Sequence, residues 1–406
     1  MRFVPLAAAL AGLPLFAQTQ PPQTWVDPAT GHRVVRLTDE PGSASLYFNQ
    51  NWFTPDGKKL VYTSPTGIYT MDLATHASKR VVEGRVRLVE AGKKTPGVYY
   101  IKSGSIFYTD AESGATREIA KLPPNGSVST INADETLLAG TYTEASGPAN
   151  NAYSAPGQQA QALDQPANKG QMMEQRLAAH IPMGMFVIST KTGESKTILR
   201  STDWLNHLLF SPTDPTLLMF CHEGPWHKVD RIWTIRTDGS QIAKLHTRTM
   251  AMEIFGHEFW STDGKTIYYD LQTPRGEDFW LAAYGVENGE RTWYHLERNE
   301  WSIHFNVSAD GTLMCGDGGD PGQVAKAPDG EWIYLFRPEL IHNQGVDDKG
   351  MVKPGVLHAE KLVNMSRHKY TLEPNVRFSP DAKWVLFRSN MFGPTYVFAV
   401  EVAKAQ

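Results

Sequence analysis

The sequence has little cysteine and lacks long apolar segments. Only two of its 406 residues are cysteine, Cys221 and Cys315, so no disulfide framework holds the fold together. Beyond the N-terminus, no stretch reaches the roughly 18 apolar residues of a membrane-spanning helix. The formal net charge is only −4, which provides no field that attracts nucleic acid. An anionic partner therefore needs a local binding site.

The N-terminus is the one strongly apolar segment. Residues 1–20 read "MRFVPLAAALAGLPLFAQTQ", with a single Arg before an apolar run that ends in small and polar residues. This pattern is typical of a cleaved signal peptide, here residues 1–17. A buried N-terminal helix is the weaker alternative, because the prolines that follow interrupt helical continuity. We expect export, to the periplasm or outside the cell.

One short phrase recurs along the rest of the chain. An aromatic or apolar residue is followed by Ser or Thr, any residue, Asp, usually Gly, and then an alternating strand. The Asp-Gly pair, or its substitute, predicts a tight turn between two strands. The phrase occurs at 53–64, 210–220, 259–270, 305–316 and 378–389, with a weaker copy at 131–142.

A second phrase, strand–polar turn–strand, follows each copy of the first. Two hairpins in series make a four-stranded antiparallel unit, and units repeating every 40–50 residues or so are typical of a β-propeller. These second hairpins are expected at 68–82, 106–120, 185–199, 232–246 and 281–296.

The two ends of the chain give the number of blades. The last unit ends one outer strand short, whereas residues 25–40 resemble an outer strand without its inner partners. Joining them closes the ring and removes the free edges. The sequence therefore predicts an all-β, seven-bladed propeller over 22–406, with loop insertions at about 144–180 and 338–360. The two cysteines fall in different blades, so we expect two free buried thiols.

Polar residues recur at one position of the repeat, four residues before its Ser or Thr. Because the preceding strand lines the central channel, equivalent positions lie at one level around the axis. The weak copy has Val128 there; Glu373 shares a face with the last member of the set. A mixture of imidazole and oxygen donors suits Mn²⁺, Ca²⁺ or Mg²⁺. The polar positions are Gln50, His207, His257, His304 and Asn375.

With these residues in place, the chain resembles the oligogalacturonate lyases, which are seven-bladed propellers that cleave short pectin fragments. The resemblance covers most of the chain after the signal peptide. Its specific parts are "FCHEGP", "VDRIW" and "HEFW", whereas the Asp-Gly phrase occurs in many propellers. The stretches that carry it are "YFNQNWFTPDGKKL", "FCHEGPWHKVDRIWTIRTDGS", "GHEFWSTDGKTIYY" and "DGTLMCGDG".

The resemblance implies a β-elimination at a uronate residue, assisted by Mn²⁺. It places His257 as the Brønsted base, Arg231 as a substrate-binding residue and His304 as a metal ligand. The chain departs from the family where two histidine ligands are usual, because it has Glu373 and Asn375 there. Both side chains suit a hard cation, so the prediction of a metal site stands while the identity of the metal and the sugar stays open.

Other residues of the predicted site would contact the sugar. His207 and Gln50 would bind hydroxyl or carboxylate groups, and Trp226 and Trp260 would stack on sugar rings, although aromatic residues more often serve packing. The partner predicted is an anionic oligosaccharide, with no nucleic acid.

Three alternatives compete with this interpretation. A non-catalytic propeller could serve as a binding scaffold, but a scaffold has no need of three converging histidines. A serine peptidase propeller is disfavoured because the chain has no G-x-S-x-G sequence. A lyase acting on another uronate-containing oligosaccharide remains the main rival, because of Glu373 and Asn375.

Overall fold

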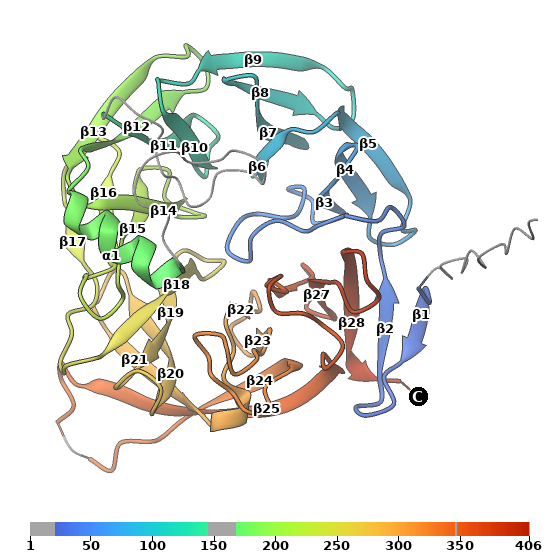
Figure 1. The fold of residues 1–406 in the computed structure, drawn as a ribbon, viewed down its shortest axis with the longest axis vertical. Helices are drawn as coiled ribbons and strands as arrows, with labels where there is room; N and C mark the ends of the chain where they lie inside the picture. Colours follow the sequence, from blue (N-terminus) through green and yellow to red (C-terminus); the bar gives the residue numbers. More distant parts are fainter. Residues whose placement is uncertain (1–20, 145–167, 346, 406) are drawn as a thin grey trace, which may run out of the picture.

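The computed structural model describes residues 21–144, 168–345 and 347–405. The predicted signal peptide lies outside these residues. The described chain forms a ring of antiparallel sheets around a central axis (Figure 1). Six sheets are present, and the eight-stranded one contains two blades, so the described residues make seven blades. The prediction of an all-β, seven-bladed propeller is confirmed.

The blades follow one another along the chain, and five have four strands running from the axis outward. The first has three strands and an isolated bridge between Phe53 and Leu60 in place of the innermost strand. In chain order the strands are β3 (Lys59–Ser64), β4 (Gly67–Asp72), β5 (Ser78–Glu83); β6 (Arg87–Ala91), β7 (Gly97–Lys102), β8 (Ser105–Asp110), β9 (Thr116–Lys121); β10 (Gly126–Ile131), β11 (Leu137–Thr143), β12 (Met183–Ser189), β13 (Ser195–Ser201); β14 (Trp204–Phe210), β15 (Leu217–Glu223), β16 (Ile232–Arg236), β17 (Ala243–Lys244); and β18 (Ile254–Trp260), β19 (Thr266–Gln272), β20 (Phe279–Gly285), β21 (Arg291–Leu296).

The last two blades complete the ring. The sixth is built from β22 (Phe305–Val307), β23 (Met314–Gly316), β24 (Trp332–Leu340) and β25 (Val352–Asn364), and a 3₁₀ turn at Arg298–Glu300 precedes it. The seventh contains β26 (Arg377–Phe378), β27 (Trp384–Ser389) and β28 (Tyr396–Lys404) from the C-terminus, with β2 (His32–Arg36) and β1 (Thr24–Val26) from the N-terminus.

The N-terminal strand closes the ring, as the sequence predicts. β2 pairs with β28 in antiparallel register, with Val34 opposite Val400. Val34 is fully buried, and β28 would otherwise present a free edge. The seventh blade is therefore held together by residues from opposite ends of the chain.

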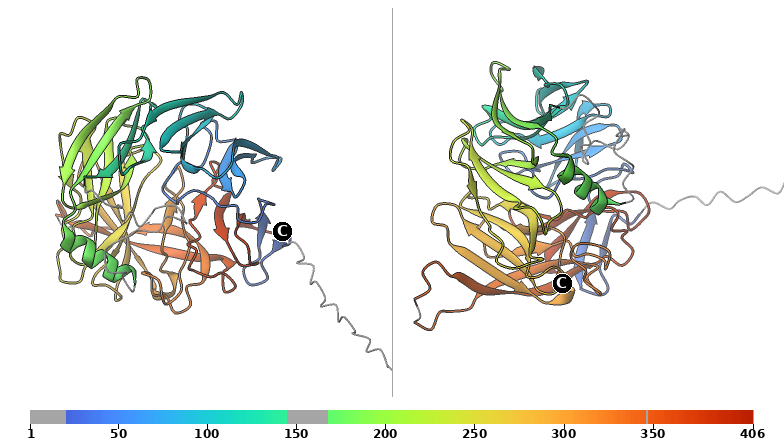
Figure 2. Two further views of the ribbon diagram at one scale, coloured as in Figure 1. Left: turned by 45° about the horizontal axis from the view of Figure 1, so that its top comes forward. Right: turned by 60° about the vertical axis from the view of Figure 1, so that its left-hand side comes forward.

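The predicted insertions contain regular structure that the sequence analysis missed. Within the second, residues 352–360 belong to β25, which pairs with β24 and also in parallel with β21. This pairing satisfies the backbone groups of a segment that we expected to be a loop, and the hairpin extends beyond the ring (Figure 2). Within the first, helix α1 (Lys169–Ala179) occupies residues that we also expected to be a loop.

The repeated Ser/Thr-x-Asp phrase makes one local structure in four blades. In the first, the Thr54 hydroxyl donates to Asp56 at 2.7 Å and accepts the Lys59 amide at 3.1 Å. The carboxylate of Asp56 also accepts the Lys58 amide. The same Ser–Asp hydrogen bond, 2.6 Å long, recurs at Ser261, Ser308 and Ser379. These bonds fix each turn, and hence the register of the strand leading into it.

The core consists of apolar side chains between neighbouring blades. Cys221 and Cys315 are both free and buried, as expected from their placement in different blades. In the described part of the chain, no helix is long and apolar enough to cross a membrane.

Candidate active site

The histidines of the repeat reach the channel through irregular backbone. At His207 and His257 the inner strands β14 and β18 shift register, and both residues have left-handed φ angles of 48° and 46°. Asn375 has a φ of 56° at the matching position. Such a bulge turns a side chain out of the regular ladder, and non-glycine residues in this conformation often mark functional sites.

A pocket opens beside His207 and His257. Of the residues predicted from the sequence, His207, Arg231, His257 and Trp226 line it, whereas Gln50, His304, Glu373 and Asn375 do not. The pocket is lined by Tyr47, Phe48, Asn49, Lys169, His207, Glu223, Trp226, Arg231, His257 and Glu258.

His257 and His304 lie side by side at this mouth of the channel. Their ring centroids are 4.7 Å apart at 66°, and the ring of Phe48 packs 4.4 Å from His304. Asp270, buried behind the strand, places a carboxylate oxygen 3.4 Å from Nδ1 of His257. The structure thus brings together the predicted base and the predicted metal ligand.

His304 is oriented by a carboxylate that the sequence analysis missed. Its Nδ1 donates to Oδ2 of Asp317 at 2.8 Å, and Oδ1 of Asp317 accepts the backbone N–H of His304 at 2.7 Å. This arrangement leaves Nε2 with a lone pair, which faces the Tyr47 hydroxyl at 3.1 Å and Oε2 of Glu373 at 3.8 Å. Carboxylate–histidine pairs of this kind are the usual support of metal-bound imidazoles.

Glu373 and Asn375 differ in what they offer a cation. The carboxylate of Glu373 is partly exposed and faces His304. Burial would raise the pKa of Glu373, but the charges of His304, His257, Lys169 and Arg388 outweigh it and lower the pKa. Asn375 is fully buried, and both ends of its carboxamide are occupied: Oδ1 accepts the Phe48 amide and Nδ2 donates to the Glu373 carbonyl. Glu373 thus faces His304, whereas the carboxamide of Asn375 is engaged by backbone groups of the chain.

Two of the donors present fit a divalent cation. The distance between Nε2 of His304 and Oε2 of Glu373 is 3.8 Å, which is too long for a hydrogen bond. A cation lying about 2.1 Å from each of these two atoms would bridge them. Among the described residues, no group of three or more His, Cys, Asp or Glu side chains is arranged to hold a metal ion. Water and substrate would therefore supply the remaining ligands.

Arg231 lines the pocket together with His257. It is only 1% exposed, and its guanidinium donates to Glu223 while lying 4.4 Å from the centroid of the Trp226 ring. His207 also contacts Glu223, with Nε2 3.1 Å from Oε2. Burial would raise the pKa of Glu223, but Arg231 and His207 hold it well below its usual range. Arg231 and His207 are thus joined through one carboxylate.

Gly256, at the start of "GHEFW", lets Trp226 and Arg231 approach the strand. A Cβ at this position would lie 2.8 Å from the Trp226 ring and 3.1 Å from Nε of Arg231. Trp260, four residues further on, is 8% exposed and donates to the Leu209 carbonyl. It therefore packs in the core, the role that aromatic residues more often serve, and does not line the pocket.

Gln50 supports the neighbouring loop. Its Oε1 accepts the Tyr47 amide, and its Nε2 donates to the Val89 carbonyl at 2.7 Å. Its carboxamide therefore shapes the segment that presents Tyr47 to the pocket.

Several buried polar atoms around the pocket lack a hydrogen-bond partner among the described residues. They are Nδ1 of His257, Nε of Arg231, Oδ1 of Asp270 and both carboxylate oxygens of Glu258. Unsatisfied buried groups are costly to a fold, so a cluster of them indicates a site shaped for a ligand or ordered water.

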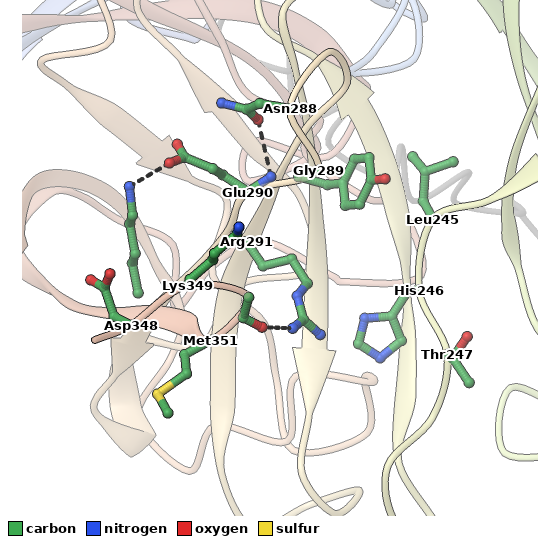
Figure 3. Close-up of a pocket in the computed structure, with 13 residues that line it drawn as sticks. Leu245, His246, Thr247, Asn288, Gly289, Glu290, Arg291, Asp348, Lys349 and Met351 are labelled. Atoms are coloured by element: carbon green, nitrogen blue, oxygen red, sulfur yellow. Dashed lines mark hydrogen bonds and ion pairs between the residues drawn. The ribbon is translucent and has the colours of Figure 1, made fainter. Parts of the chain in front are cut away.

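A larger cavity of about 640 Å³ lies elsewhere, between β21 and the segment before β25 (Figure 3). Its charged groups are largely occupied: Lys353 pairs with Glu290 at 2.8 Å, and Arg291 donates to the Gly350 carbonyl at 2.7 Å. None of the predicted site residues lines it. This cavity is the larger of the two, but the reactive groups are gathered in the pocket at the channel mouth. We therefore take that pocket as the candidate active site.

Known proteins match this chain over most of its length. A family model described as oligogalacturonate lyase matches residues 169–405. The chain belongs to the oligogalacturonate lyase family. The family resemblance inferred from the sequence is confirmed, and the protein is a member of a family of carbon–oxygen lyases.

Individual members of the family agree with this assignment. The chain is 27% identical over 391 residues to an oligogalacturonate lyase of Dickeya dadantii, covering 93% of this chain and 95% of the relative. It is 26% identical over 396 residues to an oligogalacturonide lyase of Pectobacterium atrosepticum, with the same coverage.

Solved structures of the family share the fold. An oligogalacturonate lyase in complex with manganese has a TM-score of 0.74 at 24% identity, covering 94% of this chain and 96% of that one. The oligogalacturonate lyase of Vibrio parahaemolyticus has a TM-score of 0.72 at 24% identity, with the same coverage.

Three site residues escaped the sequence analysis although signals for them existed. Glu223 lies within the "FCHEGP" stretch, two residues from the cysteine, and Asp317 directly follows β23. Lys169 begins a segment rich in helix-forming residues, preceded by Asn168, a favoured helix N-cap.

Proposed function

We propose that this protein cleaves short oligogalacturonates by metal-assisted β-elimination. The observation that carries the proposal is the contact between His257 and the His304–Asp317 pair, with Arg231 lining the same pocket as His257. A base, a cation ligand and an anion-binding group are the three elements that elimination at a uronate requires. The family assignment supports the same reaction.

His304 and Glu373 would hold the cation, for which Mn²⁺ is our first choice and Ca²⁺ or Mg²⁺ are alternatives. A relative of similar fold contains manganese. A divalent cation on the C6 carboxylate makes H5 more acidic by drawing negative charge towards the carboxylate oxygens. Asn375 remains a predicted ligand from the sequence, and the proposal does not depend on it.

The protein's own residues orient and deprotonate the sugar. Arg231, held by Glu223, contributes positive charge to the pocket. His257, whose Nδ1 lies 3.4 Å from a carboxylate oxygen of Asp270, takes H5 as a proton on Nε2. The electron pair forms the C4=C5 double bond and the C4–O bond breaks. The departing oxygen takes a proton from solvent, and the new non-reducing end is an unsaturated uronate.

Digalacturonate incubated with the protein and Mn²⁺ tests this proposal. The conjugated product absorbs in the ultraviolet, so absorbance should rise with time, and EDTA should suppress the rise. A flat trace on digalacturonate and on a panel of other uronate oligosaccharides would favour a non-catalytic scaffold.

A second candidate is a lyase that acts on a different uronate oligosaccharide. The specific observation is the replacement of two usual family histidines by Glu373 and Asn375. Activity on another member of the panel, with none on digalacturonate, would establish this alternative.

We also propose that the protein is exported, with the periplasm as its destination. The support is the apolar N-terminal run and the small and polar residues that end it. Expression of the full chain followed by mass measurement of the periplasmic protein should show loss of residues 1–17. An uncleaved cytoplasmic product would contradict export.

A further inference from the structure

The helix inserted into the third blade lies over the fourth. α1 connects β11 to β12, yet Met173 is buried in a cluster with side chains of β14 and β15. Arg176 is 4% exposed and lies 5.2 Å from the Trp204 ring centroid. An ion pair of 2.8 Å joins Glu174 to Lys228. Apolar, cation–π and ionic contacts therefore fix the helix at one face of the ring (Figures 1 and 2).

This anchoring directs the first helical residue into the active-site pocket. Asn168 caps the helix, with its side chain accepting the Gln171 amide at 2.9 Å. Lys169, the next residue, lines the same pocket as Arg231 and His257. It stands at the end of the helix where the backbone dipole is positive, so two sources of positive potential coincide.

Lys169 forms no ion pair with the described residues. It is exposed, and no carboxylate of the described residues lies within 4.0 Å of its ammonium group. A lysine that lines a pocket and has no carboxylate partner among the described residues is suited to bind an anionic group of the ligand.

The pocket has enough groups for one uronate without this lysine. The cation ligands and Arg231 serve the carboxylate of the sugar that loses H5. A neutral neighbouring sugar would leave the ammonium group without an anion, whereas a second uronate would supply one.

We propose that Lys169 binds the carboxylate of the sugar on the leaving side of the scissile bond, so that the protein selects two consecutive uronates. This inference rests on the proposed lyase function and specifies its substrate. Lys169 would thus be a specificity residue that α1 brings to the site from a neighbouring blade.

Two disaccharides separate this role from a structural one. Digalacturonate carries a carboxylate on the leaving sugar, whereas galactosyl-(1→4)-galacturonate carries none and is eliminated at the same kind of uronate. In Lys169→Met the ratio of kcat/KM for digalacturonate over the galactosyl compound should fall by about ten- to a hundred-fold, as expected for losing a charged hydrogen bond. Lys228→Met, which removes a neighbouring positive charge and the ion pair to α1, should leave the ratio unchanged.

Binding measurements make the test independent of turnover. In a His257→Ala background, calorimetry with Mn²⁺ present should show Lys169→Met weakening digalacturonate by the same factor, with a much smaller change for the galactosyl compound. If Lys169→Met lost the same affinity for both disaccharides, the role of Lys169 would be merely structural. If it lost affinity for neither, the inference would also be overturned. Absence of turnover by the otherwise unaltered protein, with this binding preference intact, would instead overturn the lyase proposal alone.

Discussion

Nδ1 of His304 lies 2.8 Å from Oδ2 of Asp317, and both side chains are fully shielded from solvent. The other oxygen of Asp317 accepts the backbone N–H of His304, so the carboxylate fixes both the ring and the strand that carries it. The imidazole therefore presents Nε2, and not Nδ1, to the pocket. A cation bound at Nε2 would therefore depend on Asp317, which orients the imidazole without contacting the cation.

Asp317→Asn should weaken metal binding. Both carboxylate oxygens accept from N–H groups, so an asparagine must turn its NH₂ group towards one of these donors. We expect the Mn²⁺ affinity to fall by about 10- to 100-fold, the usual effect of losing such a support. Calorimetric titration with Mn²⁺ measures this, with Asp56→Asn in an exposed turn as the control. Unchanged affinity would show that His304 is not a metal ligand.

Glu223→Gln should destabilise the fold strongly. The substitution preserves shape but leaves the buried Arg231 guanidinium without its counter-charge. Breaking a buried ion pair in this way costs about 3 kcal/mol or more. Urea denaturation should show this loss, whereas Glu118→Gln on the exposed β9 strand should change the free energy of unfolding by under about 0.5 kcal/mol. Similar stabilities for the two variants would contradict the pairing.

The same carboxylate should make stability depend on pH. Because Arg231 and His207 lower the pKa of Glu223 in the folded protein, unfolding raises it towards its usual value of 4.5. The stabilising contribution is therefore complete above pH 4.5 and is lost progressively as the pH falls below it. The denaturation midpoint should be measured from pH 6 to pH 3, a range that brackets the usual pKa of 4.5. Over this range the midpoint should fall more steeply for the unaltered protein than for Glu223→Gln. Parallel curves would mean that Glu223 is not held ionised by its neighbours.

Removing the N-terminal strand should open the ring. A chain beginning at residue 41 lacks β2, whose Val34 and Val35 are buried against the seventh blade. Burying two valines contributes roughly 3–6 kcal/mol, and the exposed edge of β28 favours aggregation. We expect a lower Tm and oligomers in light scattering, compared with a chain beginning at residue 21. A truncated monomer with the same Tm would argue against closure by this strand.

The sequence predicts the repeat far better than the individual contacts of the site. The position four residues before each Ser or Thr brings His207, His257 and His304 to one mouth because blade geometry repeats. The Asn375 position follows the same rule, yet both ends of its carboxamide hydrogen-bond to the backbone. Periodicity places a backbone position, whereas the direction of a side chain depends on its neighbours.

Partners from other strands escaped prediction for a related reason. Glu223 lies on β15, next to the strand β14 that carries His207. Asp317 directly follows β23, and His304 directly precedes the neighbouring strand β22. Only the register between strands brings each pair together. α1 was missed because we judged the whole insertion by its Ala- and Gln-rich beginning. The residues that pack the helix against another blade, Met173 and Arg176, have no signal in the repeat.

The most direct test of the account compares the unaltered protein with His257→Ala on digalacturonate in the presence of Mn²⁺. Removing a general base lowers the rate by about 10²- to 10⁴-fold. We predict a loss of kcat within this range while digalacturonate binding and the Tm remain close to those of the unaltered protein. If the variant instead produced unsaturated uronate at a rate within about two-fold of the original, His257 could not be the group that removes the proton.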